Sequence, residues 1–265
     1  MHARLRPPAG LVSLLLIVPA LALTAGCSSD PEGPLLGPAA TSTSGLDAAQ
    51  SGPNATAREF ENPPFEPANF VTGVNHPFFP LVPGTTFTFL EPDGDERTVI
   101  EVLHETKDIL GVTATVVRDR VYVGDDLVED TLDWFAQDKD GNVWYLGEDV
   151  KNYAGGQLVD TEGSWEAGMN GARAGINMLA EPEVGDAYFQ EDAPGVAEDK
   201  AKVKRDDVDV SVPYGDFEDC LQTLEWITLE PGSKGFKFYA RGVGLVLESG
   251  LNGKGRSELV SVTTP

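Results

Sequence analysis

The residues of this chain best suited to chemistry are carboxylates, and the most unusual group surrounds a tryptophan. Residues 162–168 read Glu-Gly-Ser-Trp-Glu-Ala-Gly, so Trp165 and Glu166 stand between glycines that allow a ligand to approach closely. In one interpretation this segment is a binding lip over a sheet. In the other, which we favour, it is a glycine-bounded loop held by one buried tryptophan.

Paired carboxylates can also hydrolyse a glycosidic bond, which requires two acids about 5–10 Å apart across a sugar. Glu148, Glu166 and Glu191 are the candidates for an enzyme of this kind acting on envelope polymers. Because the chain holds 43 acidic residues, such a pair carries little information by itself. Ser164 lacks the Gly-x-Ser-x-Gly context of a hydrolase nucleophile. The sequence leaves an enzymatic activity undecided and leans against one.

An acidic stretch in the middle of the chain raises the question of calcium. Its oxygen-bearing residues are Asp138, Asp140, Asn142, Glu148 and Asp149. When Gly141 is aligned with the glycine of an EF-hand loop, Ala136 and Gly147 fall at the first and last ligand positions. We therefore interpret the stretch as a hairpin turn and expect no cofactor, although the acidic loops could hold calcium weakly.

Ligands for a transition metal are scarce. His76 and His104 are the only histidines beyond the leader, and Cys220 is the only soft ligand apart from Cys27. A zinc site needs three or four ligands, so we expect no metal site. His76 precedes Pro77 and is interpreted as a structured loop residue. It joins Trp165, Glu166 and Glu148 as a candidate ligand-binding residue.

Short β-strands must position these residues. Residues 85–90 alternate threonine with Phe87 and Phe89, residues 92–95 form a Pro-Asp-Gly-Asp turn, and residues 98–103 return as a second strand. The pattern recurs along most of the chain. Further strands are expected over 112–123, 127–137, 143–146, 208–212, 220–229, 236–240, 243–247 and 258–262. Residues 168–180 could hold one turn of helix. The predicted fold class is all-β, with a single curved antiparallel sheet forming a barrel or half-barrel over 63–265.

Three segments carry a resemblance to known proteins. They are residues 75–85 (Asn-His-Pro-Phe-Phe-Pro-Leu-Val-Pro-Gly-Thr), 141–148 (Gly-Asn-Val-Trp-Tyr-Leu-Gly-Glu) and 239–246 (Tyr-Ala-Arg-Gly-Val-Gly-Leu-Val). Together they resemble an uncharacterised family of bacterial secreted proteins and lipoproteins. The first and last also resemble envelope proteins with a concave antiparallel half-barrel, as in lipoprotein carriers. The resemblance implies a fold and assigns no role to any residue.

The N-terminus predicts where the protein resides. Arg4 and Arg6 precede an apolar run of about 13 residues, which suits a signal peptide and is too short to span a bilayer. The segment Leu-Thr-Ala-Gly-Cys that ends at Cys27 is typical of a lipobox. We expect residues 1–26 to be a lipoprotein signal peptide and Cys27 to carry lipid. Residues 27–62 are expected to be a flexible tether that holds the domain at the extracytoplasmic side of a membrane.

The formal charge of −24 restricts the partners. A polyanion is repelled by nucleic acid, so we exclude nucleic-acid binding. We expect the membrane, through the lipid on Cys27, and either a small amphipathic ligand or an envelope protein as partners. A non-catalytic binding module is the favoured function, and a carboxylate-dependent hydrolase or a structural surface protein are the alternatives.

Overall fold

The chain folds as an almost purely β structure. The computed structural model describes residues 60, 62–92 and 94–265. Within them, the one helical turn is the 3-10 segment η1 (Pro67–Asn69). The strands of the first half are β1 (Phe70–Val71), β2 (Val74–His76), β3 (Phe79–Leu81), β4 (Thr86–Leu90), β5 (Glu96–Ile109), β6 (Val112–Val123), β7 (Asp126–Asp138), β8 (Val143–Ala154) and β9 (Gln157–Asp160). Those of the second half are β10 (Trp165–Glu166), β11 (Gly175–Met178), β12 (Ala187–Phe189), β13 (Asp199–Val212), β14 (Gly215–Ile227), β15 (Lys234–Ala240), β16 (Gly244–Gly250) and β17 (Ser257–Thr263).

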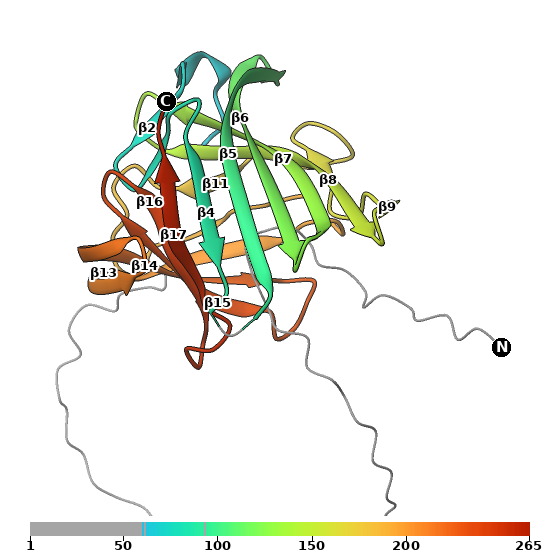
Figure 1. The fold of residues 1–265 in the computed structure, drawn as a ribbon. Helices are drawn as coiled ribbons and strands as arrows, with labels where there is room; N and C mark the ends of the chain where they lie inside the picture. Colours follow the sequence, from blue (N-terminus) through green and yellow to red (C-terminus); the bar gives the residue numbers. More distant parts are fainter. Residues whose placement is uncertain (1–59, 61, 93) are drawn as a thin grey trace, which may run out of the picture. The chain divides into compact units, whose positions relative to one another are not determined.

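One large antiparallel sheet contains most of these strands. Its main path runs β10-β8-β7-β6-β5-β4-β17-β16-β15-β14-β13-β12, so nearly every strand pairs with its neighbour in sequence. Two pairs on this path are not neighbours in sequence: β10 pairs with β8, and the β4–β17 pair joins the first and last parts of the chain at the centre of the sheet (Figure 1). This is the meander expected from alternating strands and short turns.

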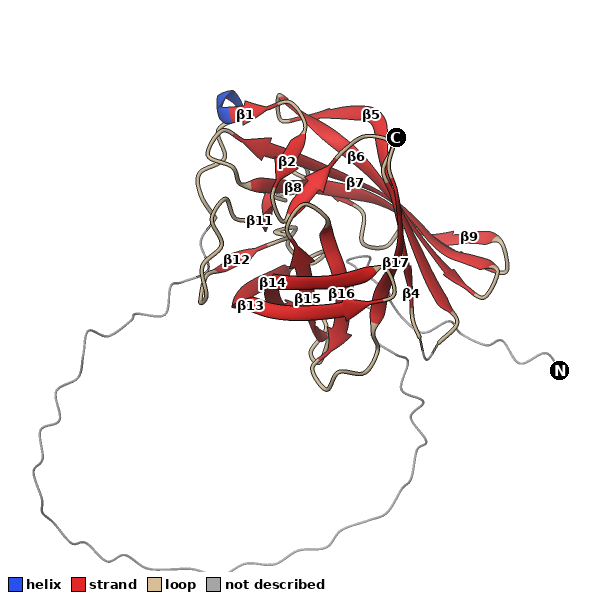
Figure 2. Ribbon diagram, turned by 60° about the vertical axis from the view of Figure 1, so that its left-hand side comes forward, coloured by secondary structure: helices blue, strands red, loops and turns tan. Residues whose placement is uncertain are grey.

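The sheet is strongly curved but its strand path does not close. β13 to β16 turn back so that they face the long strands β5 to β8 (Figure 2). The two ends of the path approach each other where Arg173 and Asp192 form an isolated bridge and an ion pair of 2.6 Å. The expected curved antiparallel sheet is confirmed, and it takes the open form.

Residues before the sheet cover its outer face and one of its edges. Phe65 and Phe70 pack on Trp144 with ring centroids 5.3 and 5.9 Å apart. The Asn62 side chain donates to the carbonyl of Phe189 at 2.9 Å and accepts from its N–H at 3.0 Å. Asn62 thus occupies the edge of β12 as a further strand residue would. Phe60, within the segment expected to be tether, packs on Phe189 and Trp226 with ring centroids 5.9 and 5.5 Å apart.

The hairpin of β2 and β3 covers one end of the curved sheet. The Asn75 N–H donates to Oε1 of Gln137 at 2.8 Å, and Nε2 of Gln137 donates back to Asn75 at 3.0 Å. On the other side, the Gly242 N–H donates to the carbonyl of Pro77 at 2.7 Å. The hairpin therefore joins the end of β7 to the β15–β16 turn and places Phe79 and Leu81 over the interior.

The helical turn considered for residues 168–180 does not form. The Ala172 N–H donates to the carbonyl of Met169 in a tight turn, and β11 follows and pairs with β8. Gly168 and Gly171 have φ values of 87° and 88°, which a right-handed helix does not tolerate. The segment extends the sheet instead.

Candidate functional site: a cavity inside the curved sheet

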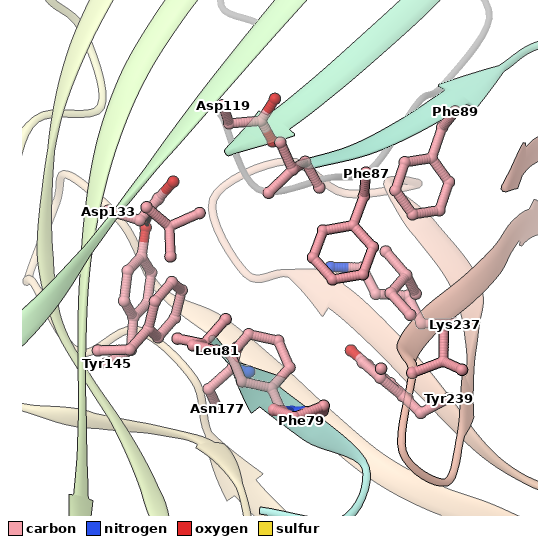
Figure 3. Close-up of a pocket in the computed structure, with 17 residues that line it drawn as sticks. Phe79, Leu81, Phe87, Phe89, Asp119, Asp133, Tyr145, Asn177, Lys237 and Tyr239 are labelled. Carbon is pink, nitrogen blue, oxygen red and sulfur yellow. Dashed lines mark hydrogen bonds between the residues drawn. The ribbon is translucent and has the colours of Figure 1, made fainter. Parts of the chain in front are cut away.

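The concave face of the sheet encloses a cavity of about 80 Å³ beneath the β2–β3 hairpin (Figure 3). Most of its wall is apolar. The apolar lining residues are Phe79, Pro80, Leu81, Phe87, Phe89, Ile100, Val117, Phe135, Val243, Gly244 and Leu245. Residues 75–85, 141–148 and 239–246 all contribute to this wall, through Phe79, Tyr145 and Tyr239 among others.

A smaller part of the wall is polar. It consists of Asp119, Asp133, Tyr145, Asn177, Lys237 and Tyr239. Asp133 and Tyr145 lie on one side of the cavity, and Lys237 and Tyr239 lie on the opposite side (Figure 3). The Tyr145 hydroxyl donates to Oδ1 of Asp133 at 2.5 Å. Oδ1 of Asp119 is buried and has no hydrogen-bond partner among the described residues. The Nδ2 donor of Asn177 is likewise buried without a partner in the described part of the chain. The cavity is thus amphipathic, with one acceptor and one donor unsatisfied.

A β-bulge brings two polar residues of β8 to the inner face. Phe135 pairs with Tyr145 and Asp133 pairs with Glu148, so two steps along β7 match three steps along β8. The extra residue leaves both Tyr145 and Glu148 pointing inward. Gly147 occupies the bulge with φ 129°, and a Cβ there would overlap the carbonyl oxygen of Trp165. Glycine is therefore required for this arrangement.

Buried acids surround the cavity. Burial raises the pKa of Asp133 to about 7, and it raises the pKa of Asp119 well above its usual range, with the nearby Asp133 adding to the effect. Further from the cavity, burial also raises the pKa of Glu148 and Glu191 well above their usual range. Burial raises the pKa of Asp199 to about 6, against the hydrogen bond with Glu191, which lowers it.

Among the described residues one lysine is buried, Lys237, and its charge is already paired. Nζ of Lys237 lies 2.9 Å from Glu225 and 3.9 Å from Glu248. Burial lowers the pKa of Lys237, but Glu225 and Glu248 more than offset that effect, so its pKa is raised overall. Glu225 also accepts hydrogen bonds from Thr223 at 2.7 Å and from Tyr239 at 3.1 Å. Lys237 is thus a fixed ammonium within an acidic network.

The structure brings three of the four candidate ligand-binding residues together, on β8 and β10. Trp165 pairs with Glu148, and Glu166 pairs with Gly147. Trp165 is buried and packs edge-on against Tyr145 at 5.5 Å, so it supports the cavity wall without lining it. Glu166 instead forms an ion pair of 2.7 Å with Lys107 and is half-buried.

His76 lies away from the cavity, buried in β2. Its Nδ1 accepts the N–H of Phe78 at 3.1 Å, and its Nε2 lies 3.2 Å from the carbonyl of Ala180. Burial lowers the pKa of His76. The ring contributes to a separate groove of about 570 Å³ that Arg241 and Asp219 also line.

The acidic stretch after β7 is a hairpin turn, as predicted. Asp138 accepts hydrogen bonds from the Gly141 and Asn142 N–H groups at 2.8 Å each and from Nδ2 of Asn142 at 2.9 Å. It also accepts from Nε1 of Trp144 at 2.8 Å. Its oxygens are therefore occupied by internal donors. In the part of the chain that the structure describes, no three acids, histidines or cysteines are placed to hold a metal ion.

The structure describes one of the two cysteines, Cys220. Cys27, the expected lipidation site, lies outside the described residues together with the expected leader and most of the tether. Cys220 is buried as a free thiol, and burial raises its pKa to about 11. Within the described ranges, no helix has the length and apolar character needed to cross a bilayer.

Sequence reasoning missed the polar residues that line the cavity. Asp119 alternates with Val117 and Val121 on the same face of β6. An acid among the apolar residues of one strand face could have identified Asp119 as a functional candidate. Lys237 gives no such signal, because its partners lie on other strands. Comparison of the chain with protein-family models, with curated proteins and with solved structures finds no match, so the functional argument rests on the residues themselves.

Proposed function

We propose that this protein is a non-catalytic binding module that holds a small amphipathic ligand in the cavity of its curved sheet. The observation that carries the proposal is the combination of an apolar wall with a polar side where Oδ1 of Asp119 lacks a partner. Binding sites for small molecules are typically apolar hollows with a few convergent polar groups. A ligand with one polar end would satisfy the orphaned acceptor.

The size of the cavity limits the ligand. A water molecule needs roughly 10–15 Å³ of such space, so 80 Å³ corresponds to about six waters. This volume suits a ligand of roughly six to ten non-hydrogen atoms. The proposed ligand is therefore a small amphipathic molecule, not a long-chain lipid.

The alternative of a carboxylate hydrolase has less support. Glu148 and Glu191 are 1% and 0% exposed, and neither lines the cavity. Glu166 is held by Lys107. Glycoside hydrolysis requires two acids that both reach the substrate, and these three residues do not offer such a pair.

We also propose that the chain is a bacterial lipoprotein, anchored through lipid on Cys27 with the domain on the extracytoplasmic side. The basic, apolar and lipobox segments of the leader support this proposal. Cells grown with labelled palmitate should label the wild-type chain and the Cys220→Ser variant, but not the Cys27→Ser variant. Equal labelling of all three chains would contradict the proposal.

Binding is tested with three compounds of similar shape and size: 2-phenylethanol, 2-phenylethylamine and phenylacetate. Ligand-detected NMR is recorded with the full chain carrying Cys27→Ser, so that no detergent is needed. Val243→Trp fills the cavity, whereas Val82→Trp places the same side chain at a site that is 52% exposed. Binding of at least one compound should be lost in Val243→Trp and kept in Val82→Trp. The proposal fails if no compound binds or if Val243→Trp binds as well as Val82→Trp.

A further inference from the structure

The polar side of the cavity shows which end group the ligand should carry. We propose that the ligand is a small organic cation, an amine whose ammonium group binds Asp119 and Asp133 and whose aromatic or short aliphatic body fills the apolar wall. This inference rests on the proposed binding function and adds the chemical class of the ligand.

Asp119 is the first element of this recognition. It is 5% exposed, it lines the cavity, and its Oδ1 has no donor among the described residues. Buried acceptors are satisfied in nearly all folded proteins, so this oxygen marks a position where a donor is missing. An ammonium group offers up to three donors and no acceptor, which matches an orphaned carboxylate oxygen.

Asp133 supplies the second carboxylate. Asp119 pairs with Thr131 and Val117 pairs with Asp133, so the two acids are diagonal neighbours on the inner face of β6 and β7. The Tyr145 hydroxyl occupies Oδ1 of Asp133, which orients the carboxyl group and leaves Oδ2 for a ligand. Both acids are labelled on the same part of the cavity wall in Figure 3.

The charges that face this pair disfavour an anionic end group. The charged or titratable groups near Asp119 and Asp133 are Glu129 on β7, Tyr145 and Glu148 on β8, Lys237 on β15 and Glu248 on β16. Lys237 is the only cation among them, and it is already paired with Glu225 and Glu248. A carboxylate ligand would therefore enter a region with more acids than free cations, whereas an ammonium would balance them.

Aromatic rings suit the rest of such a ligand. Phe79, Phe87 and Phe135 line the cavity, and Phe135 stacks on Tyr145 with centroids 4.7 Å apart. Ring faces attract cations, and they pack equally well on a phenyl or short alkyl body. The same cavity thus accepts both ends of an aromatic amine of the stated size.

Binding of an ammonium should release a proton. Without ligand, burial raises the pKa of Asp133 to about 7 and the pKa of Asp119 well above its usual range. A nearby cation favours the charged carboxylate, so the bound amine lowers both pKa values and an acid proton passes to solvent. The amine enters already protonated and keeps its proton. Affinity for the amine should therefore rise with pH from about 5 to 8.

The test is isothermal titration of the full chain carrying Cys27→Ser with the three shape-matched compounds. At pH 7, 2-phenylethylamine should bind at least about tenfold more tightly than 2-phenylethanol, and phenylacetate should bind most weakly. Titration in two buffers of different ionisation enthalpy should show proton release for the amine and none for the alcohol. This measurement requires no variant.

Two variants then assign the effect to the site. Asp119→Asn preserves shape and should weaken amine binding at least about tenfold, with alcohol binding changed by less than about threefold. Asp125→Asn, at the exposed β6–β7 turn, should change neither. Equal affinities for the three compounds, absence of proton release, or unchanged amine binding in Asp119→Asn would each overturn the inference. Binding of the alcohol without the amine would overturn the inference and leave the proposed function intact, whereas binding of none would overturn both.

Discussion

The buried acids predict an unusual dependence of stability on pH, in which the protein is most stable in mild acid. Asp133 and Glu248 give the clearest case: Asp133 is partly buried at the cavity wall, Glu248 is buried, and burial raises their pKa values to about 7 and about 8, respectively. The corresponding unperturbed values are 3.8 and 4.5. Near pH 6 these two acids therefore hold two protons that the unfolded chain has lost, and Asp119, Glu148 and Glu191, whose pKa values are also raised by burial, add to that number.

The sign follows from this difference in bound protons. A folded-state pKa above the unfolded value contributes stability that is fully present below the unfolded pKa and is lost as pH rises through the folded pKa. Each such proton changes the free energy of unfolding by about 1.4 kcal/mol per pH unit. The protons on Asp133 and Glu248 together give about 3 kcal/mol per pH unit near pH 6. Because the acids interact, we expect a loss of about 1–3 kcal/mol between pH 5.5 and 6.5.

One group acts in the opposite direction. Burial lowers the pKa of His76, so this histidine contributes stability above its usual pKa of 6.5 and loses it as pH falls. It accounts for one proton and so reduces the slope without reversing it. Lys237, whose pKa is raised, stays charged throughout this range and leaves the slope unchanged.

Thermal unfolding followed by circular dichroism at pH 5, 6, 7 and 8 measures the effect. For a domain of this size, each kcal/mol lowers the Tm by roughly 2–4 °C, so the Tm should fall by several degrees across the range. Glu248→Gln should flatten the dependence, because the amide resembles the protonated acid at every pH. Asp125→Asn serves as the exposed control. A Tm that stays constant or rises from pH 5 to 8 would refute the assignment of these protons.

Three further substitutions test the architecture around the cavity by urea unfolding. Gly147→Ala should cost about 2–4 kcal/mol, since its methyl group meets the Trp165 backbone; a cost below about 0.5 kcal/mol would contradict the bulge. Lys237→Met should cost about 3–5 kcal/mol at pH 8, because it leaves two buried acids unpaired, and less at pH 5. Asp138→Ala should cost about 2–4 kcal/mol through lost turn hydrogen bonds, whereas Asp140→Ala should cost under about 1 kcal/mol; equal costs would refute the special role of Asp138.

Local pattern was sufficient to locate most of the long strands, although β8 and β13 extend well beyond the ranges expected for them, 143–146 and 208–212. The strand expected over residues 112–123 has the same bounds as β6, because β-branched residues fill it and glycine-containing turns flank it on both sides. The faces of Phe87 and Phe89 were also correct, since both line the cavity. These features depend on neighbours within one hairpin, which a sequence records directly.

The inward face of β7 could not be derived in the same way. Leu132 and Trp134 form the apolar phase of this strand, yet Asp133 and Phe135 face the cavity. Trp134 is buried on the other face, where Nζ of Lys107 lies 3.2 Å from the centre of its ring. Because both faces of β7 are covered, alternation cannot identify the inner one. The bulge at Gly147 adds to this difficulty by changing the phase of β8.

The acids of the interior form two groups, and we expect substitutions in only one of them to affect ligand binding. Asp119 and Asp133 reach the cavity, whereas Glu148, Glu191 and Asp199 do not. Stability alone would favour amides or apolar residues at all five positions, because ionising a buried carboxyl group costs free energy and so destabilises the folded protein. If the cavity pair binds a ligand, Asp119→Asn should raise the Tm at pH 8 and weaken amine binding together.

Glu148→Gln provides the contrasting case. Both carboxylate oxygens of Glu148 are buried without a hydrogen-bond partner in the described ranges, and its pKa is raised well above the usual value. The amide should therefore raise the Tm at pH 8, leave it nearly unchanged at pH 5, and leave amine binding within about threefold of wild type. If Glu148→Gln lost amine binding to the same extent as Asp119→Asn, acids outside the cavity would also contribute to amine binding. The boundary of the ligand site would then have to include the β8 bulge.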